Sequence, residues 1–212
     1  MLKTTIDQPG KPNKALMALG ILQGYIKHPW WFLLTTLLTL PGFKKQIPQD
    51  LPQDFVQVVA LQTWMYLRLK ARVGQEKAYK IVRACVLPVG LAIQQGNLRA
   101  VEAPRTFENL ITYQRRTNRE GPTRWNKMEV LEQSDRRLEF RVSNCMFHDF
   151  YTRLGVAELT KLMCEVDNAI FNVYLPEQVT FHRNGLGNRI ADGAPACHFV
   201  LEHHVPRQET RE

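Results

Sequence analysis

The chain has 212 residues, of which 44% are hydrophobic and 23% are charged. These values are typical of a globular protein, and they exclude a wholly disordered chain, a collagen-like chain and a membrane protein with many spans. The net charge is +8, but Lys and Arg are not clustered among aromatic residues, so we expect no nucleic-acid binding. The first fourteen residues are polar and lack the apolar core of a secretory signal. We therefore expect a cytoplasmic protein with free thiols.

Residues 15–45 contain two apolar stretches, and Pro41 is expected to end the second. The second stretch has about half of the roughly 20 apolar residues that a transmembrane helix needs. We expect residues 15–45 to pack on the body or on a second subunit, which would give a homodimer. The alternative is peripheral membrane contact, with Trp30 and Trp31 at the headgroups and nearby lysines facing anionic lipid.

Three helices are predicted in the middle of the chain. The apolar spacing over residues 55–73 predicts the first, with Gly74 as its stop signal. The second covers about 75–95, and Pro88 is expected to kink or break it because proline lacks the N–H that the helix needs. The third is a short helix over 106–113 with Thr106 as its N-cap.

The apolar spacing changes to two residues after Trp125, which is typical of half-buried strands. A hairpin is expected between residues 128 and 142, with its turn at 133–135. A long helix over 156–174 follows, and then a second hairpin whose last strand covers residues 197–202. This order predicts an α+β fold, in which N-terminal helices precede a small antiparallel sheet with a long helix packed on it.

The predicted organisation has three parts. Residues 1–50 form a tail and an apolar arm, residues 51–207 form the α+β domain, and residues 208–212 form a short tail.

Cysteines, a histidine and an aspartate supply the candidate chemistry. Cys145 and His148 are three residues apart, and so are Cys164 and Asp167; on a helix the latter pair lies about 60° apart and can face one point. Cys145, Cys164 and Cys197 could hold a divalent metal such as zinc and activate a water. A thiolate could instead attack a carbon electrophile directly, with His148 or Asp167 carrying protons. The cysteines could also be small core residues with no chemical role.

Three segments between residues 142 and 200 resemble the L-2-amino-thiazoline-4-carboxylic acid hydrolase family. They read VSNCMFHDFYTRLGVAEL, CEVDNAIF and VTFHRNGLGNRIADGAPACHF. The resemblance implies hydrolysis of a small thiazoline or amidine-like ring at the carbon between nitrogen and sulfur. It gives functional weight to Cys145, Cys164, Asp167 and Cys197.

The ending Gly193-x-x-x-Cys197-x-Phe199 is also similar to the vinyl-reductase-type small-molecule binding domain. That similarity implies a vinyl-reductase-domain-like fold. It also implies a different role, a non-catalytic module that binds a small molecule or a tetrapyrrole-related ligand and has a structural Cys-rich site.

Of the two functions, we favour a hydrolase-like enzyme that acts on a small cyclic C=N substrate. The nucleophile would be Cys164 or a metal-bound water, and Asp167 and His148 would carry protons. Arg183 and Arg189 are candidate substrate-binding residues, because a guanidinium binds a carboxylate through two parallel hydrogen bonds.

Overall fold

The computed structural model describes residues 14–99, 105–121, 123–175, 177–185 and 187–204. They divide into two compact units at the boundary between Ile93 and Gln94. We call the described residues up to Ile93 the helical unit and those from Gln94 onward the sheet unit. Residues 1–13 of the predicted N-terminal tail and the predicted C-terminal tail, residues 208–212, lie outside the described residues. The predicted domain boundary at residue 50 stays a prediction.

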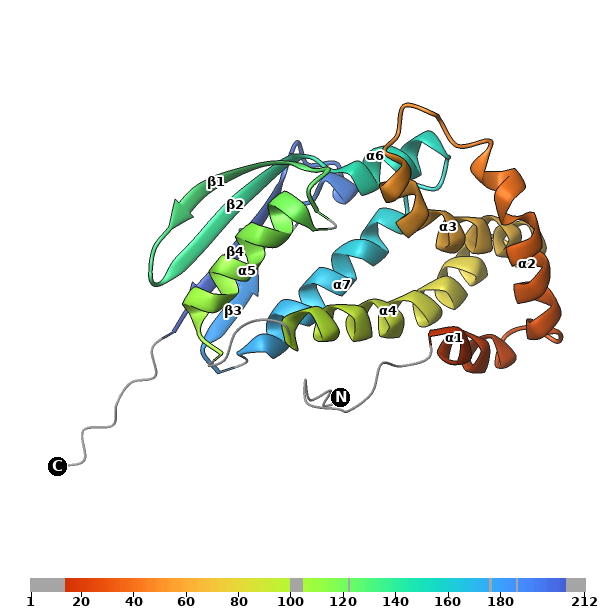
Figure 1. Cartoon of the computed structure of the whole chain (residues 1–212), viewed down its shortest axis with the longest axis horizontal. Helices are drawn as coiled ribbons and strands as arrows, with labels where there is room; N and C mark the ends of the chain where they lie inside the picture. The colour runs from red at the N-terminus through yellow and green to blue at the C-terminus, as the bar shows by residue number, and fades with distance from the viewer. Residues whose placement is uncertain (1–13, 100–104, 122, 176, 186, 205–212) are drawn as a thin grey trace. The chain divides into compact units, whose positions relative to one another are not determined.

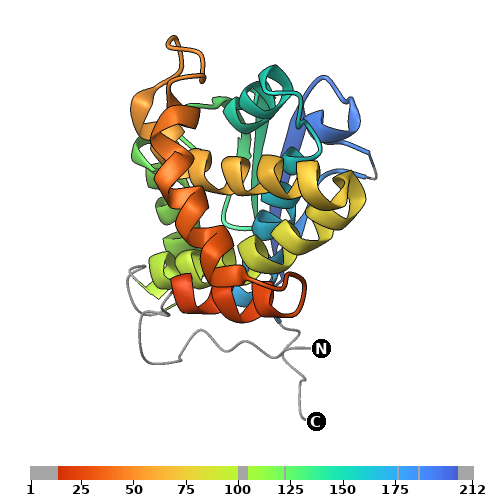
Figure 2. The same ribbon diagram turned by 90° about the vertical axis from the view of Figure 1, so that its right-hand side faces the viewer.

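The helical unit consists of α-helices. Their bounds are Lys14–Gln23 for α1, Pro29–Lys44 for α2, Gln53–Val73 for α3 and Gln75–Arg99 for α4, whose last turns pass into the sheet unit. Helix α2 packs against α3 (Figures 1 and 2). In that contact Phe32 and Thr36 of α2 are buried, and Arg68 of α3 donates a hydrogen bond of 2.7 Å to Thr36 Oγ1. Within the described residues, none of the helices combines the length and the apolar character that crossing a bilayer requires.

Two prolines were expected to end, kink or break helices, and both helices continue through them; a kink at Pro88 stays a prediction. Pro41 does not end α2, which continues to Lys44. Because Pro41 lies in the last turn, its missing N–H costs only the one hydrogen bond to the carbonyl four residues earlier, and its own carbonyl still accepts from Lys45 N at 3.4 Å. Pro88 does not break α4 either. One face of α4 is buried, and such packing can outweigh the roughly 3 kcal/mol that an internal proline costs.

The sheet unit contains two antiparallel hairpins and three α-helices. In chain order its elements are α5 (Phe107–Glu120), β1 (Lys127–Gln133), β2 (Arg137–Asn144), α6 (Met146–Arg153), α7 (Leu159–Tyr174), β3 (Val179–His182), the 3-10 helix η1 (Ile190–Asp192) and β4 (Cys197–His203). The strands form one antiparallel sheet in the order β1-β2-β4-β3. The predicted α+β fold is confirmed.

One face of this sheet is covered by helices α5 and α7 (Figure 1). The core on that face contains residues of β2 and β4 at facing positions, such as Phe140 opposite Phe199 and Val142 opposite Cys197. Because neighbouring residues of a strand point to opposite faces, Glu139 and His198 lie on the other face. This alternation fixes which side chains of β4 can reach α7.

Local signals account for most of the helix boundaries in the two units. Thr106 caps α5 as predicted, because its hydroxyl accepts from Asn109 N at 3.1 Å, and Gly74 ends α3 with a positive φ of 80°. Helix α5 is longer than predicted and reaches Glu120. Helix α6 was not predicted at all. Its first residue is Met146, so Cys145 is the N-cap residue of the helix.

Candidate functional site

Helix α7 places the side chains of Cys164 and Asp167 near strands β3 and β4 of the sheet. Asp167 Oδ2 lies 3.4 Å from Nη2 of Arg183, the residue that follows β3. Burial raises the pKa of Asp167 to about 6, although the nearby Arg183 guanidinium acts in the opposite direction. A carboxyl group with this pKa is ionised at neutral pH but accepts a proton more readily than an ordinary aspartate, which suits a general base.

Arg183 is more than nine-tenths buried, and its guanidinium is only partly satisfied. Its Nε donates to Asn168 Oδ1 at 3.2 Å, and the guanidinium carbon lies 4.2 Å from the ring centre of Phe199. The buried Nη1 has no hydrogen-bond partner among the described residues. Because buried donors are almost always satisfied, this nitrogen marks a position where an acceptor from outside the protein can bind. We call Asp167 and Arg183 together the Asp167 pair.

The three cysteines of the sheet unit lie close enough to Asp167 for its negative charge to affect the pKa of each thiol. Burial raises the pKa of Cys145 to about 11 and that of Cys164 to about 12, and it also raises the pKa of Cys197. Negative charge on Asp167 contributes to all three increases. These thiols are therefore protonated at neutral pH, and none is a preformed thiolate nucleophile.

Each thiol has a different environment. Cys145 is the N-cap residue of α6, where the amides of His148 and Phe147 partly offset the effect of burial on its pKa. Cys197 Sγ accepts a hydrogen bond of 3.1 Å from the backbone N–H of Ile190 in η1. Cys164 is buried on α7. No three His, Cys, Asp or Glu side chains in the described part of the chain are arranged to hold a metal ion, so the predicted zinc site has no support and stays a prediction.

His148 lies on α6 beside an open pocket of about 220 Å³ that Cys145 and Ile190 also line. Its Nδ1 is 3.3 Å from Thr160 Oγ1, and its Nε2 is 3.5 Å from Thr152 Oγ1. These hydroxyls orient the imidazole at the pocket. The predicted role of His148 as a proton carrier stays a prediction.

Arg189, the second predicted carboxylate-binding residue, already has an acidic partner. Its Nη2 donates to Oδ1 of Asp192 in η1 at 3.1 Å, and Lys161 Nζ lies 3.3 Å from the same oxygen. An external carboxylate would have to compete with Asp192 for this guanidinium. Of the two predicted arginines, Arg183 is therefore the better placed to bind a ligand.

The family model described as L-2-amino-thiazoline-4-carboxylic acid hydrolase matches residues 56–201. The chain belongs to this family. The match covers much more than the last third of the chain, so most of helix α3 and all of helices α4 and α5 are part of the family's region. Membership supports a hydrolase-like function. No curated protein and no solved structure matches the chain, and no comparison supports the expected similarity to the vinyl-reductase-type domain.

Sequence reasoning missed the way in which Arg183 is held. The stacking of its guanidinium on Phe199 depends on the pairing of β3 with β4, which brings residues sixteen positions apart into contact. The sequence does contain a stop signal for α6, which is Gly155. Glycine often ends a helix because it can adopt a positive φ, and in the structure Gly155 has a φ of +68° just after the helix.

Proposed function

We propose that the chain hydrolyses a small ring that contains a C=N bond and carries a carboxylate, such as L-2-amino-thiazoline-4-carboxylate. The observation that carries this proposal is the Asp167 pair, with its buried, unpartnered Arg183 Nη1 beside a carboxyl group of raised pKa. The family membership supports the ring chemistry.

Arg183 binds the substrate carboxylate in this proposal. Its Nη1 is free to donate, and stacking on Phe199 holds the guanidinium plane in place. A bound carboxylate adds negative charge close to Asp167 and competes for Arg183. Both effects raise the pKa of Asp167 further and make it a stronger base when the substrate is present.

Asp167 then accepts a proton from the attacking water. The water oxygen bonds to the ring carbon between nitrogen and sulfur while the C=N π electrons move to the ring nitrogen, which takes the proton from Asp167 and gives a neutral tetrahedral intermediate. The hydroxyl of this intermediate next gives its proton to Asp167 and becomes a carbonyl as the bond from the carbon to the ring sulfur or ring nitrogen breaks, and the departing atom takes that proton from Asp167. The net reaction adds one water molecule and opens the ring.

The protonated thiols define the alternative nucleophile. Cys164 is next to Asp167 on α7, and it could attack the same carbon if Asp167 removed its proton during the step. We place water first because the high pKa values of Cys145 and Cys164 leave almost no thiolate at neutral pH. In this mechanism the buried thiols form the apolar wall that keeps the pKa of Asp167 high.

The test is a ring-opening assay with L-2-amino-thiazoline-4-carboxylate, using wild type, Asp167→Asn and Cys164→Ala, with mass spectrometry of the quenched enzyme. The proposal predicts turnover by the wild type, loss of turnover by Asp167→Asn and at most about tenfold loss by Cys164→Ala, with no mass adduct. A ring-derived adduct on Cys164 would show thiol attack instead. Tight binding of the compound without turnover by the wild type would favour the non-catalytic binding module.

A further inference from the structure

We propose that helix α2 of the helical unit docks on an anionic membrane surface, lying in the plane of the interface. This inference is independent of the proposed hydrolysis. It rests on an apolar helix face that the described structure leaves uncovered, together with the charges that flank it.

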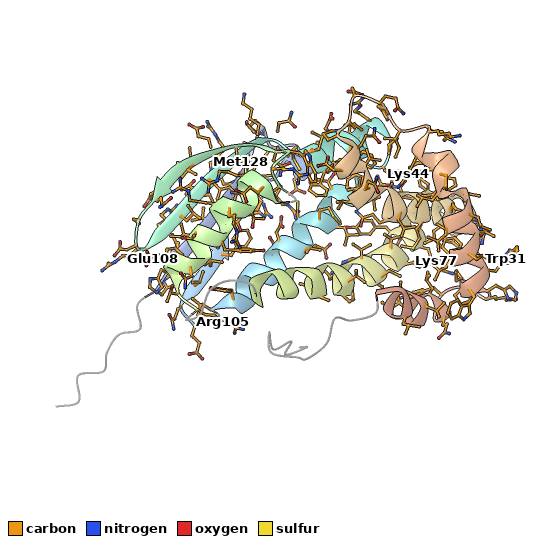
Figure 3. The ribbon with its side chains drawn as sticks, in the orientation of Figure 1. Trp31, Lys44, Lys77, Arg105, Glu108 and Met128 are labelled. Atoms are coloured by element: carbon orange, nitrogen blue, oxygen red, sulfur yellow. The ribbon has the colours of Figure 1, made fainter. Side chains whose placement is uncertain are left out.

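The uncovered face of α2 is built from five large apolar side chains, which we call the α2 face. They are Trp30 (65% exposed), Trp31 (62%), Leu34 (48%), Leu37 (53%) and Leu38 (69%). At 100° per residue these positions span an arc of about 120°. The buried residues Phe32, Thr36 and Phe43 lie on the opposite side of the helix, toward α3. Figure 3 shows the Trp31 side chain pointing away from the ribbon.

The polar groups near the α2 face are satisfied within the helical unit. Thr35 Oγ1 donates to the carbonyl of Trp31 at 2.8 Å, and Thr39 Oγ1 donates to that of Thr35 at 2.6 Å. The indole N–H of Trp64 in turn donates to Thr39 Oγ1 at 2.8 Å. The threonines of α2 therefore add little polarity, and a surface of two tryptophans and three leucines is large for one exposed helix.

The charges around the α2 face indicate that its binding partner is an anionic membrane surface. Residues 8–49 contain no Asp or Glu and five lysines, which are Lys11, Lys14, Lys27, Lys44 and Lys45. Lys27 and Lys45 are exposed just beyond the two ends of α2. An apolar helix face with exposed lysines at both ends and no acidic residue complements anionic headgroups, and exposed tryptophans favour the headgroup level.

A second copy of the chain fits this surface less well. In a symmetric dimer the same face meets itself, so the lysines of both copies would gather around one contact without an acidic partner from residues 8–49.

The 16 residues of α2 span about 24 Å along the axis, which is less than the roughly 30 Å hydrocarbon core. Lying in the interface plane satisfies both the length and the charges.

Vesicle flotation of the full chain tests this proposal, with phosphatidylcholine vesicles that contain either 40% phosphatidylglycerol or none. We expect flotation only with the anionic vesicles and its loss in about 0.5 M salt, where charges are screened beyond a few ångströms. Equal flotation with both vesicles, or none with either, would overturn the proposal.

Three double variants locate the contact. Trp31→Gln with Leu38→Gln should reduce anionic-vesicle binding by more than tenfold, and Lys27→Gln with Lys45→Gln by about tenfold. Val130→Gln with Leu131→Gln is the matched control, because these residues of β1 are also exposed and apolar; it should bind as the wild type does. All substituted side chains are exposed, so we expect unchanged melting, which circular dichroism checks.

Sedimentation velocity without lipid completes the test. We expect the Trp31→Gln, Leu38→Gln variant and the wild type to sediment alike. A wild-type dimer that this variant abolishes, together with no binding to anionic vesicles, would show that the α2 face joins two copies and would overturn the membrane proposal. Loss of vesicle binding by the β1 control as strong as that by the α2 variant would overturn it as well.

Discussion

Two carboxylates of the sheet unit, the buried Glu139 and the half-buried Asp167, interact with arginine on opposite faces of the same sheet, and their environments differ. Glu139 on β2 accepts from Arg137 Nη2 at 2.8 Å and from Asn184 Nδ2 at 3.0 Å, and His198 Nδ1 lies 2.9 Å from its Oε1. We call these four residues the Glu139 network. Hydrogen bonding from Arg137, and then from His198, holds the pKa of Glu139 below its usual value.

The Asp167 pair has the opposite character. Burial dominates there and raises the pKa of the carboxyl to about 6, and one arginine nitrogen lacks a partner among the described residues. A carboxylate with three donors around it is stabilised in its charged form and has little left to offer a ligand. The comparison therefore favours a structural role for the Glu139 network, and it supports our proposal that the Asp167 pair acts on the substrate.

The largest effect should come from Asp167→Asn. Loss of a general base lowers the rate of ring opening by about 10²–10⁴-fold. In the wild type, kcat/KM should fall as the pH drops below about 6, because protonated Asp167 cannot accept a proton. The variant should show no such decrease. Steady-state rates between pH 5 and 8 check this. If kcat/KM of the Asn variant fell at acidic pH as that of the wild type does, the titrating group would not be Asp167, and its contrast with Glu139 would not hold.

Substitution of Arg183 should act mainly on substrate binding. Arg183→Lys keeps the charge but loses the planar fork, so we expect KM to rise by about 10–100-fold. Arg183→Met also removes the charge that lowers the pKa of Asp167, so the acidic limb should move to higher pH. Arg141→Lys is the control, since Arg141 pairs with Glu129 on the exposed sheet face; an equal rise of KM there would contradict a specific role.

Glu139→Gln should change stability and leave the chemistry intact. Replacing a buried carboxylate that accepts charged hydrogen bonds should cost about 1.5–3 kcal/mol in the free energy of unfolding. Because the folded-state pKa lies below the unfolded one, the carboxylate stabilises the fold at neutral pH, and this contribution is lost as the pH falls below about 4.3. Urea denaturation at pH 7 and pH 4 should show a smaller gap between wild type and variant at pH 4.

The smallest effect belongs to a site outside both clusters. Thr106→Ala removes the cap of α5 and should lower the free energy of unfolding by about 1 kcal/mol. Thr106→Ser, which keeps the hydroxyl, should stay within a few tenths of a kcal/mol of the wild type. Turnover per folded molecule should be unchanged in both, and a changed KM would mean that α5 contributes to the site.

Local signals were enough to predict much of the fold. The Thr106 cap, the Gly74 stop and the alternation in β2 and β4 each depend on a few neighbouring residues. Local signals were not enough to decide whether a proline ends or breaks a helix. Whether Pro88 interrupts α4 depends on how much packing the rest of that helix gains, and this quantity is not visible in the local sequence.

The candidate site could be predicted only in part. The spacing of Cys164 and Asp167 on one helix was readable, because helical geometry places both on one side. The partner of Asp167 was not, since Arg183 reaches it through the pairing of β3 with β4 and through stacking on Phe199. The burial of Glu139 could not be predicted either. Strand alternation places Glu139 on the sheet face opposite the helices, but it does not show that neighbouring side chains bury it there.

The titration of the Asp167 carboxyl by carbon-13 NMR tests the central claim most directly. The measurement is made on the free protein and again with thiazolidine-4-carboxylate, a saturated ring that keeps the carboxylate but lacks the C=N bond. We predict a pKa near 6 in the free protein and a higher pKa with the ligand bound, because the ligand carboxylate adds negative charge and competes for Arg183. A pKa below 4 that the ligand does not change would contradict the account.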